Sequence, residues 1–403
     1  MEGTKPRTAS SIGMFDMLKG AGMLIIVFAH TAELYPMQAV SGLSLTAFFP
    51  FIYREALMAA FFIASGYGFR KRSIGKCIHQ QLKSLLKPYL YTALFTCVLH
   101  FIIHYKTFQY LPGTIGESVK VTGGFLLGLP HTAEYFGQEF FSCGPMWYLL
   151  ALMVGWILLD VILNIFPEQY VPWAVAGCAL LGWGVSLVWE PPFCLIQGAV
   201  IVPYLYIGFL AKKKHLLDEP LPPKVFAGLL GASALIAAGA LATRTTDCIS
   251  LAEWSLGPLS IFLDGAAGLL FIRLFMRLSH FHGLIVRVLE TVGRRSLHIF
   301  CIHTVEIIAI PQTMLGMSPG MKELEMLIRK HEMLHVHNTC ARWCFGNVRC
   351  AVDGNENQKP MKNRSIGRID ITVAWIIAVA AWIVKRNQKP DLAEAMRQRE
   401  YHL

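Results

Sequence analysis

Apolar runs long enough to cross a lipid bilayer recur along almost the whole of this 403-residue chain. About 20 helical residues span the roughly 30 Å of bilayer hydrocarbon. Ten segments come close to that length, and they cover residues 14–34, 48–69, 86–105, 146–166, 170–189, 194–211, 225–243, 255–276, 295–313 and 369–385. The runs are too long and too uniformly apolar for barrel strands, and a helix closes its own backbone hydrogen bonds in lipid. The sequence therefore predicts an all-α fold, a polytopic transmembrane helix bundle of about ten spans.

The composition supports this class and leaves little room for a soluble domain. Hydrophobic residues make up 54% of the chain, charged residues 15%, and the mean hydropathy is +0.47, which is outside the usual range of soluble globular proteins. We expect residues 1–313 to form one membrane domain of nine spans, and residues 369–403 to form the last span and a basic cytoplasmic tail. Residues 314–368 are expected to be an extracytoplasmic loop or insert, and the mixed charge of residues 354–368 favours disorder there.

The net charge of +10 is explained by where the basic residues lie, so no nucleic-acid partner is needed. Basic clusters occupy every second connection between spans, and by the positive-inside rule both termini face the cytoplasm. The connection at residues 314–368 breaks this pattern with nine Lys or Arg on the outer side, but long loops translocate largely regardless of charge. No small-residue cleavage site follows the first apolar run, so we expect that run to be retained as a span.

The first span carries a lysine and a histidine on one helix face. Lys19 and His30 are eleven positions apart, which is about three helical turns and a rise of roughly 16 Å. Lys19 lies near the cytoplasmic boundary, where its stem can snorkel, and Asp16 lies one turn before it. His30 lies about midway through the hydrocarbon, where ionisable groups tend to be functional. The structural alternatives are an anchoring lysine and a histidine that packs against another helix.

Two further spans carry charged or ionisable pairs. Arg54 and Glu55 are adjacent near the outer end of the second span, so they point to different helix faces and each needs its own partner. They are expected either to line the entrance to a cavity or to form ion pairs between helices. His303 and Glu306 are three apart on one face of the ninth span, where a carboxylate can hold the tautomer of an imidazole. A structural hydrogen bond between helices is the alternative.

Two patterns that suggest a metal site are weak. His100 and His104 share a helix face, but two ligands alone do not make a site. Residues 331–335, HEMLH, match the HExxH pattern of zinc proteases, yet the extension toward a third histidine is missing and the motif lies in the long outer connection. The sequence therefore predicts no required metal, although a structural metal clip in that connection stays open.

Six stretches of the chain occur in the order and spacing of a known family. They are FDMLKGAGMLIIVFAHT (residues 15–31), FFIASGYGFRKR (61–72), LLKPYL (85–90), GPMWYLLAL (144–152), VPYLYIGFLAKKK (202–214) and RRSLHIFCIHT (294–304). Together they resemble acyltransferase family 3, a family of integral membrane proteins whose first span opens with a basic residue, ten positions and a histidine. The resemblance covers residues 14–310.

The resemblance implies an O-acyltransferase that moves an acyl group, usually acetyl, from cytoplasmic acyl-CoA to a hydroxyl of a cell-envelope glycan or related sugar. The histidine of the family maps onto His30, its basic partner onto Lys19, and a recurrent histidine onto His303. The expected catalytic residues are His30, Glu55, His303 and Glu306. The expected cofactor-binding residues are Asp16, Lys19, Arg70, Lys71, Arg72, Lys83 and Lys87, and the expected substrate-binding residues are Arg54, Trp147 and Tyr148.

Geometry gives this expectation a mechanism. The thin arm of CoA can reach over the roughly 16 Å between Lys19 and His30 while its phosphates stay beside the basic residues at the cytoplasmic boundary. Neutral His30 can take a proton from an acceptor hydroxyl or form a short-lived acyl-histidine, and the sequence does not separate the two. Many members of the family have arginine at the position of Lys19, and lysine lacks the planar fork that contacts a phosphate at two points.

Competing interpretations remain for the basic and aromatic residues at the ends of the spans and for the activity of the protein. The basic residues after the second span can be solvated anchors, and Trp147 and Tyr148 can belong to the aromatic belt of a membrane boundary. A transporter or flippase also carries intramembrane charges and glycine-rich helices, but no inverted repeat is visible here. The partners expected are acyl-CoA, a glycan acceptor and the lipid bilayer, and the expected location is a bacterial cytoplasmic membrane.

Overall fold

The computed structural model of the chain describes residues 15–34, 56–218, 220–243, 245, 247–281 and 283–309. The described residues are 77% helix and 3% strand, which confirms the predicted helical class. Within the described residues, five helical stretches are long and apolar enough to cross a membrane, namely Ile74–Phe108, Gly144–Ile165, Leu195–Lys213, Pro223–Thr243 and Pro258–Leu278. The count of ten spans and the orientation of the termini stay predictions.

The helices follow the expected apolar runs closely. They are α1 (Asp16–Leu34), α3 (Met58–Gly68), α4 (Ile74–Gln81), α5 (Lys87–Phe108), α6 (Leu111–Leu127), α7 (Trp147–Ile165), α8 (Val171–Ser186), α9 (Leu195–Val200), α10 (Val202–Lys213), α11 (Pro223–Thr243), α12 (Pro258–Leu278), α13 (Leu284–Arg294) and α14 (Ser296–Ala309). A π-helical turn, η3 (Leu82–Leu86), joins α4 to α5, and a 3₁₀ turn, η4 (Gly144–Met146), precedes α7. Each of the first nine expected spans overlaps a helix, whereas the expected span at residues 369–385 lies outside the described residues.

Several elements of the structure lie outside the predicted spans, namely α4, α6, α13 and a β-hairpin. Helix α6 follows α5 directly, and an antiparallel hairpin of β1 (Ala133–Tyr135) and β2 (Gln138–Phe140) follows α6. Helix α6 ends at Gly128, whose φ of 59° allows the N–H of Leu129 to bond the carbonyl of Gly124 in a Schellman motif. Glycines, Ser, Thr and charged residues dilute the apolar pattern of α6, so its sequence gave no span signal.

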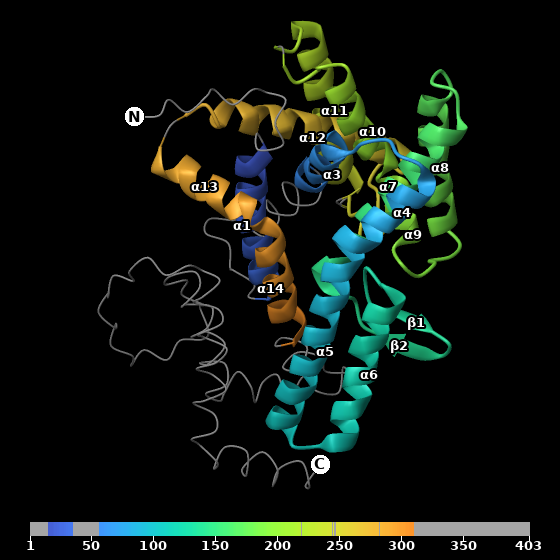
Figure 1. The fold of residues 1–403 in the computed structure, drawn as a ribbon, viewed down its shortest axis with the longest axis vertical. Helices are drawn as coiled ribbons and strands as arrows, with labels where there is room; N and C mark the ends of the chain where they lie inside the picture. Colours follow the sequence, from blue (N-terminus) through green and yellow to red (C-terminus); the bar gives the residue numbers. More distant parts are fainter. Residues whose placement is uncertain are drawn as a thin grey trace.

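Polar side chains join α5 to α6, which lie side by side in the lower part of Figure 1. Thr114 Oγ1 donates to the carbonyl of Tyr110, so its oxygen accepts from Nδ1 of His104 at 2.9 Å. One turn along, Ser118 Oγ lies 3.4 Å from Nδ1 of His100. Such hydrogen bonds hold membrane helices together. In the part of the chain that the structure describes, no group of three potential metal ligands occurs. The contacts with Thr114 and Ser118 link both histidines of α5 to α6.

Glycine contacts set how closely α1 approaches α13 and how closely α3 approaches α10. A Cβ at Gly20 would overlap the carbonyl oxygen of Leu289, and a Cβ at Gly293 would overlap that of Asp16. Helix α1 therefore packs backbone to backbone on α13, and Figure 1 shows α1 beside α13 and α14. The same type of contact joins α3 to α10 at Gly66 and Gly208. Small residues at such crossings are typical of membrane bundles.

Contacts between distant segments gather the basic residues at one end of the bundle. The ring of Phe15, just before α1, lies 5.3 Å from that of Tyr67 near the end of α3. Nζ of Lys212 at the end of α10 lies 5.8 Å from the same Tyr67 ring, and Lys213 bonds Glu168, just after α7, at 2.7 Å. We call this the basic end, and it carries Lys19, Arg70 to Arg72 and Lys212 to Lys214.

The opposite end is held by a network centred on His131. Its Nε2 lies 2.7 Å from Oε2 of Glu190, and its Nδ1 lies 3.1 Å from the carbonyl oxygen of Ser250. The hydroxyl of Tyr135 donates to the carbonyl of Glu190, and Nε2 of Gln197 donates to the carbonyl of Ser250 at 3.3 Å. The network joins the β-hairpin, the connection before α9 and residues 247–257. Both imidazole nitrogens face acceptors, so the charged form of His131 is favoured.

This network predicts a pH-dependent stability of the segment around Ser250. The hydrogen bond to Glu190 raises the pKa of His131, against the opposing effect of burial. Since the pKa is raised on folding, the stabilisation is complete below the ordinary pKa of about 6.5 and is lost as the pH rises through the raised pKa. Amide hydrogen exchange in residues 247–257, corrected for intrinsic rates, should therefore speed up as the pH rises from about 6.5 through the raised pKa of His131.

The variant His131→Gln should lose this pH dependence, whereas His280→Gln, an exposed histidine at the basic end, should keep it. An equal pH response in the wild type and in His131→Gln would contradict the assignment.

Candidate functional site

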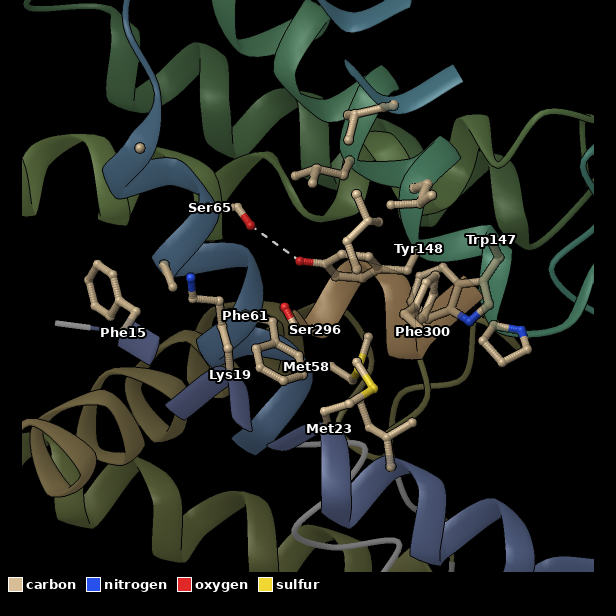
Figure 2. Close-up of a pocket in the computed structure, with 18 of the residues that line it drawn as sticks. Phe15, Lys19, Met23, Met58, Phe61, Ser65, Trp147, Tyr148, Ser296 and Phe300 are labelled. Atoms are coloured by element: carbon tan, nitrogen blue, oxygen red, sulfur yellow. Dashed lines mark hydrogen bonds between the residues drawn. The ribbon is translucent and has the colours of Figure 1, made fainter. Parts of the chain in front are cut away.

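A cavity of about 400 Å³ lies between α1, α3, α7 and the start of α14. Most of its walls are apolar or aromatic, and its polar lining residues are Lys19, His30, Ser65, Tyr148 and Ser296. Figure 2 shows Phe15 and Lys19 on one side of the cavity and Trp147 and Phe300 on the other, with Ser65 and Tyr148 between them. A volume of this size is typical of a small-molecule or cofactor site.

The cavity reaches both polar groups of the first span. Lys19 lines the cavity at the basic end, and His30 lines it eleven residues, or roughly 16 Å, further along α1. Because an α-helix brings positions eleven apart back to nearly the same azimuth, both side chains face the same space. The structure thus brings Lys19 and His30 to a single cavity, as their spacing predicts.

At the basic end, Lys19 belongs to an ion-pair cluster. Its Nζ lies 2.8 Å from Oδ1 of Asp16, and Nη1 of Arg294 lies 4.0 Å from Oδ2 of the same carboxylate. The side chain of Asp16 is 8% exposed and that of Lys19 is 30% exposed. Asp16 therefore orients the ammonium at the mouth of the cavity and offsets part of its charge. Arg294, to which the sequence analysis assigned no site role, adds a second cation here.

At the far end, His30 lies against the pair formed by His303 and Glu306. The ring centroids of His30 and His303 are 5.7 Å apart with an interplanar angle of 41°. Nδ1 of His303 lies 2.9 Å from Oε2 of Glu306, and both residues are buried. If the carboxylate accepts the Nδ1–H, Nε2 of His303 carries a lone pair. This nitrogen has no hydrogen-bond partner among the described residues.

The aromatic residues of α7 face the cavity. The hydroxyls of Tyr148 and Ser65 lie 3.2 Å apart (Figure 2). The Tyr148 ring stacks on Phe62 with centroids 4.7 Å apart. Trp147 is 8% exposed and also lines the cavity. This burial favours a role at the site over a place in the lipid-facing aromatic belt. Ser65 and Ser296 were not predicted as site residues because a single serine in an apolar run gives no distinct signal.

The remaining basic residues lie around the basic end, outside the cavity lining. Arg70, Lys71 and Arg72 follow α3, whose Gly68 lines the cavity. Nζ of Lys71 donates to the carbonyl of Leu163 at 2.6 Å, so this ammonium is bound to α7. Lys83 and Lys87 are exposed on either side of Leu85, another lining residue.

Several predicted features lie outside the described residues. They are Arg54, Glu55, the HEMLH motif at residues 331–335 and the cysteines that follow it. The expected boundary at residue 313 and both segments beyond it lie there too. These expectations stay predictions.

Comparison with known proteins yields one long match. A family model described as an acyltransferase domain, that of acyltransferase family 3, matches residues 12–316, about three quarters of the chain. A second model, the endonuclease domain of the terminase large subunit, matches residues 290–386, roughly a quarter of the chain. The described part of that second match forms the end of α13 and the apolar α14, within the first match. No curated protein and no solved structure matches the chain.

The contact between α1 and α13 should be essential to the cavity. The substitution Gly293→Ala places a Cβ against the carbonyl of Asp16, one turn from Lys19. Overpacking of this kind costs about 1–3 kcal/mol, so the thermal unfolding midpoint of purified protein should fall by several degrees. Gly228→Ala on α11 is the matched control because no heavy atom lies within 4 Å of its added Cβ. Equal midpoints for the two variants would contradict the close packing.

Proposed function

The chain belongs to acyltransferase family 3, and on that premise we propose that it moves an acyl group, usually acetyl, from cytoplasmic acyl-CoA to a hydroxyl of a cell-envelope glycan or related sugar. The observation that supports this proposal is a single apolar cavity with a cation at one end and a histidine at the other. In this proposal the protein lies in a bacterial cytoplasmic membrane, with its basic end toward the cytoplasm.

The cavity suits the two chemically different parts of the donor. The phosphates of acyl-CoA need cations and stay in water, so they fit the basic end with Lys19 and the Arg70 to Arg72 segment. The pantetheine arm is thin and mostly uncharged, so it fits the apolar passage past Met23, Phe61 and Leu152. The thioester then lies close to His30. Asp16 acts in this proposal by orienting Lys19, since a carboxylate repels phosphate.

The transfer needs a base for the acceptor hydroxyl. Neutral His30 takes the hydroxyl proton while the oxygen attacks the thioester carbonyl, the carbon–sulfur bond breaks and CoA leaves as a thiolate, which then takes up a proton. The carboxylate of Glu306, linked through His303, stabilises positive charge that develops on the imidazoles. An acyl-histidine intermediate on His30 is the alternative and uses the same residues. Trp147 and Tyr148 offer aromatic surface for a sugar ring near the reacting atoms.

A transporter or flippase is the second candidate function. It shares the bundle and its intramembrane charges, but it predicts neither thioester cleavage nor a special need for His30.

The role of His30 predicts the loss of acyl transfer in His30→Ala. Removal of a general base typically lowers the rate by a factor of about 10² to 10⁴. The measurement is the release of free CoA from acetyl-CoA by purified protein in the presence of a glycan extract. His298→Ala is the matched control, because this histidine is exposed on α14 and does not line the cavity. Transfer that persists in a folded His30→Ala protein would refute the mechanism, and a wild type that releases no CoA would favour transport.

The role of Lys19 predicts weaker donor binding in Lys19→Glu. The charge reversal should raise the Kd for CoA roughly tenfold, equivalent to about 1.4 kcal/mol, and the difference should shrink at high salt because the contact is electrostatic. Lys19→Arg should keep tight binding, and Lys224→Glu, an exposed lysine on α11, should leave it unchanged. Calorimetry with CoA checks this result. An unchanged Kd in Lys19→Glu would exclude a phosphate contact.

A further inference from the structure

One face of α7 changes character at the basic end of the cavity. Leu149, Leu152 and Trp156 line the cavity, and Asp160 and Asn164 continue the same face at four-residue intervals. Asp160 is fully buried, although an ionised carboxylate is costly to bury without partners. The partners of these two polar residues show what they hold.

Both residues bind the backbone of one arginine in the segment that joins α3 to α4. Oδ1 of Asp160 accepts the backbone N–H of Arg72 at 2.9 Å, and Nδ2 of Asn164 donates to the carbonyl of Arg72 at 2.8 Å. Nδ2 of Asn164 also lies 3.2 Å from Oδ2 of Asp160, so the two side chains support each other. Lys71 adds a third contact through its bond to Leu163. The backbone around Arg72 is therefore fixed on α7 at both its donor and its acceptor.

This segment is continuous with the wall of the cavity. Gly68, two residues before Arg70, lines the cavity, and the ring of Phe69 lies 6.2 Å from that of Trp156. The side chain of Arg70 is exposed and that of Arg72 is half-buried. Three consecutive cations repel one another, and the charges of Lys71 and Arg72 both act on Asp160. The carboxylate thus offsets that repulsion where the segment passes the cavity.

We propose that Asp160 and Asn164 are positioning residues for the phosphates of the acyl donor. They fix the backbone of Arg72 so that the guanidinium groups of Arg70 and Arg72 stand at the mouth of the cavity. The ammonium of Lys71 serves as a tie to α7 and leaves phosphate contact to the two arginines. The inference rests on the proposed function, because it assigns these residues to the donor of that reaction.

The experiment compares two donors that differ only in the phosphate-bearing head. Acetyl-CoA carries the nucleotide, whereas acetyl-pantetheine carries the same thioester and arm without phosphates. Asp160→Ala should raise the KM for acetyl-CoA roughly tenfold and change kcat little, and it should leave turnover of acetyl-pantetheine unchanged. Asn164→Ala should raise the same KM by a smaller factor. Asp160→Asn keeps an oxygen for the N–H of Arg72 but lacks the charge, so its KM should fall between those of the wild type and Asp160→Ala.

A merely structural role gives a different pattern. Loss of packing would lower turnover with both donors alike, and that result would overturn the proposal, as would an unchanged KM for acetyl-CoA in Asp160→Ala. If Asp160→Ala does not fold, Asn164→Ala and Asp160→Asn test the proposal by the same comparison of turnover with acetyl-CoA and turnover with acetyl-pantetheine. Asp264→Asn, at a buried carboxylate of α12, is the matched control. Its turnover of acetyl-CoA relative to acetyl-pantetheine should equal that of the wild type. Failure of the proposed function itself is distinct, because wild-type protein would then cleave neither donor.

Discussion

Hydrocarbon offers no hydrogen-bond partners, so every polar side chain inside this bundle depends on another part of the chain. The structure meets this constraint largely with pairs between or along helices. They are Lys19 with Asp16, Ser65 with Tyr148, His104 with Thr114, Arg72 with Asp160, and His303 with Glu306. Most of these pairs either border the cavity or hold a segment that does. The same interactions that make the polar groups tolerable in the bundle therefore determine where the chemistry can occur.

The cavity depends on how closely helices approach as much as on polar pairs. Helix α1 carries both Lys19 and His30, and its contact with α13 at Gly20 and Gly293 leaves no space for a side chain. Helix α3, which supplies the opposite wall, meets α10 through the same type of contact. These two contacts hold α1 on α13 and α3 on α10 without intervening side chains.

Charge is distributed unevenly along the cavity, and the distribution matches the chemistry of a thioester donor. Cations gather at one end, apolar and aromatic side chains line the middle, and two imidazoles backed by the carboxylate of Glu306 occupy the far end. Under the proposed function, the polyanionic head of the donor lies beside the cations and its thioester lies near His30. Hydrogen bonds from Asp160 and Asn164 of α7 to the backbone of Arg72 fix the position of the basic segment after α3.

The sequence by itself determined the helical class, the shared face of Lys19 and His30, and the pairing of His303 with Glu306, because each depends on periodicity within one helix. Helix α6 was missed because its apolar pattern is diluted. Asp160 gave no readable partner, since Arg72 lies 88 positions away along the chain. Only the tertiary structure decided that His303 meets His30 and that Asp160 holds the basic segment. Which helices touch depends on long-range packing at glycine contacts, and helical periodicity carries no information about that choice.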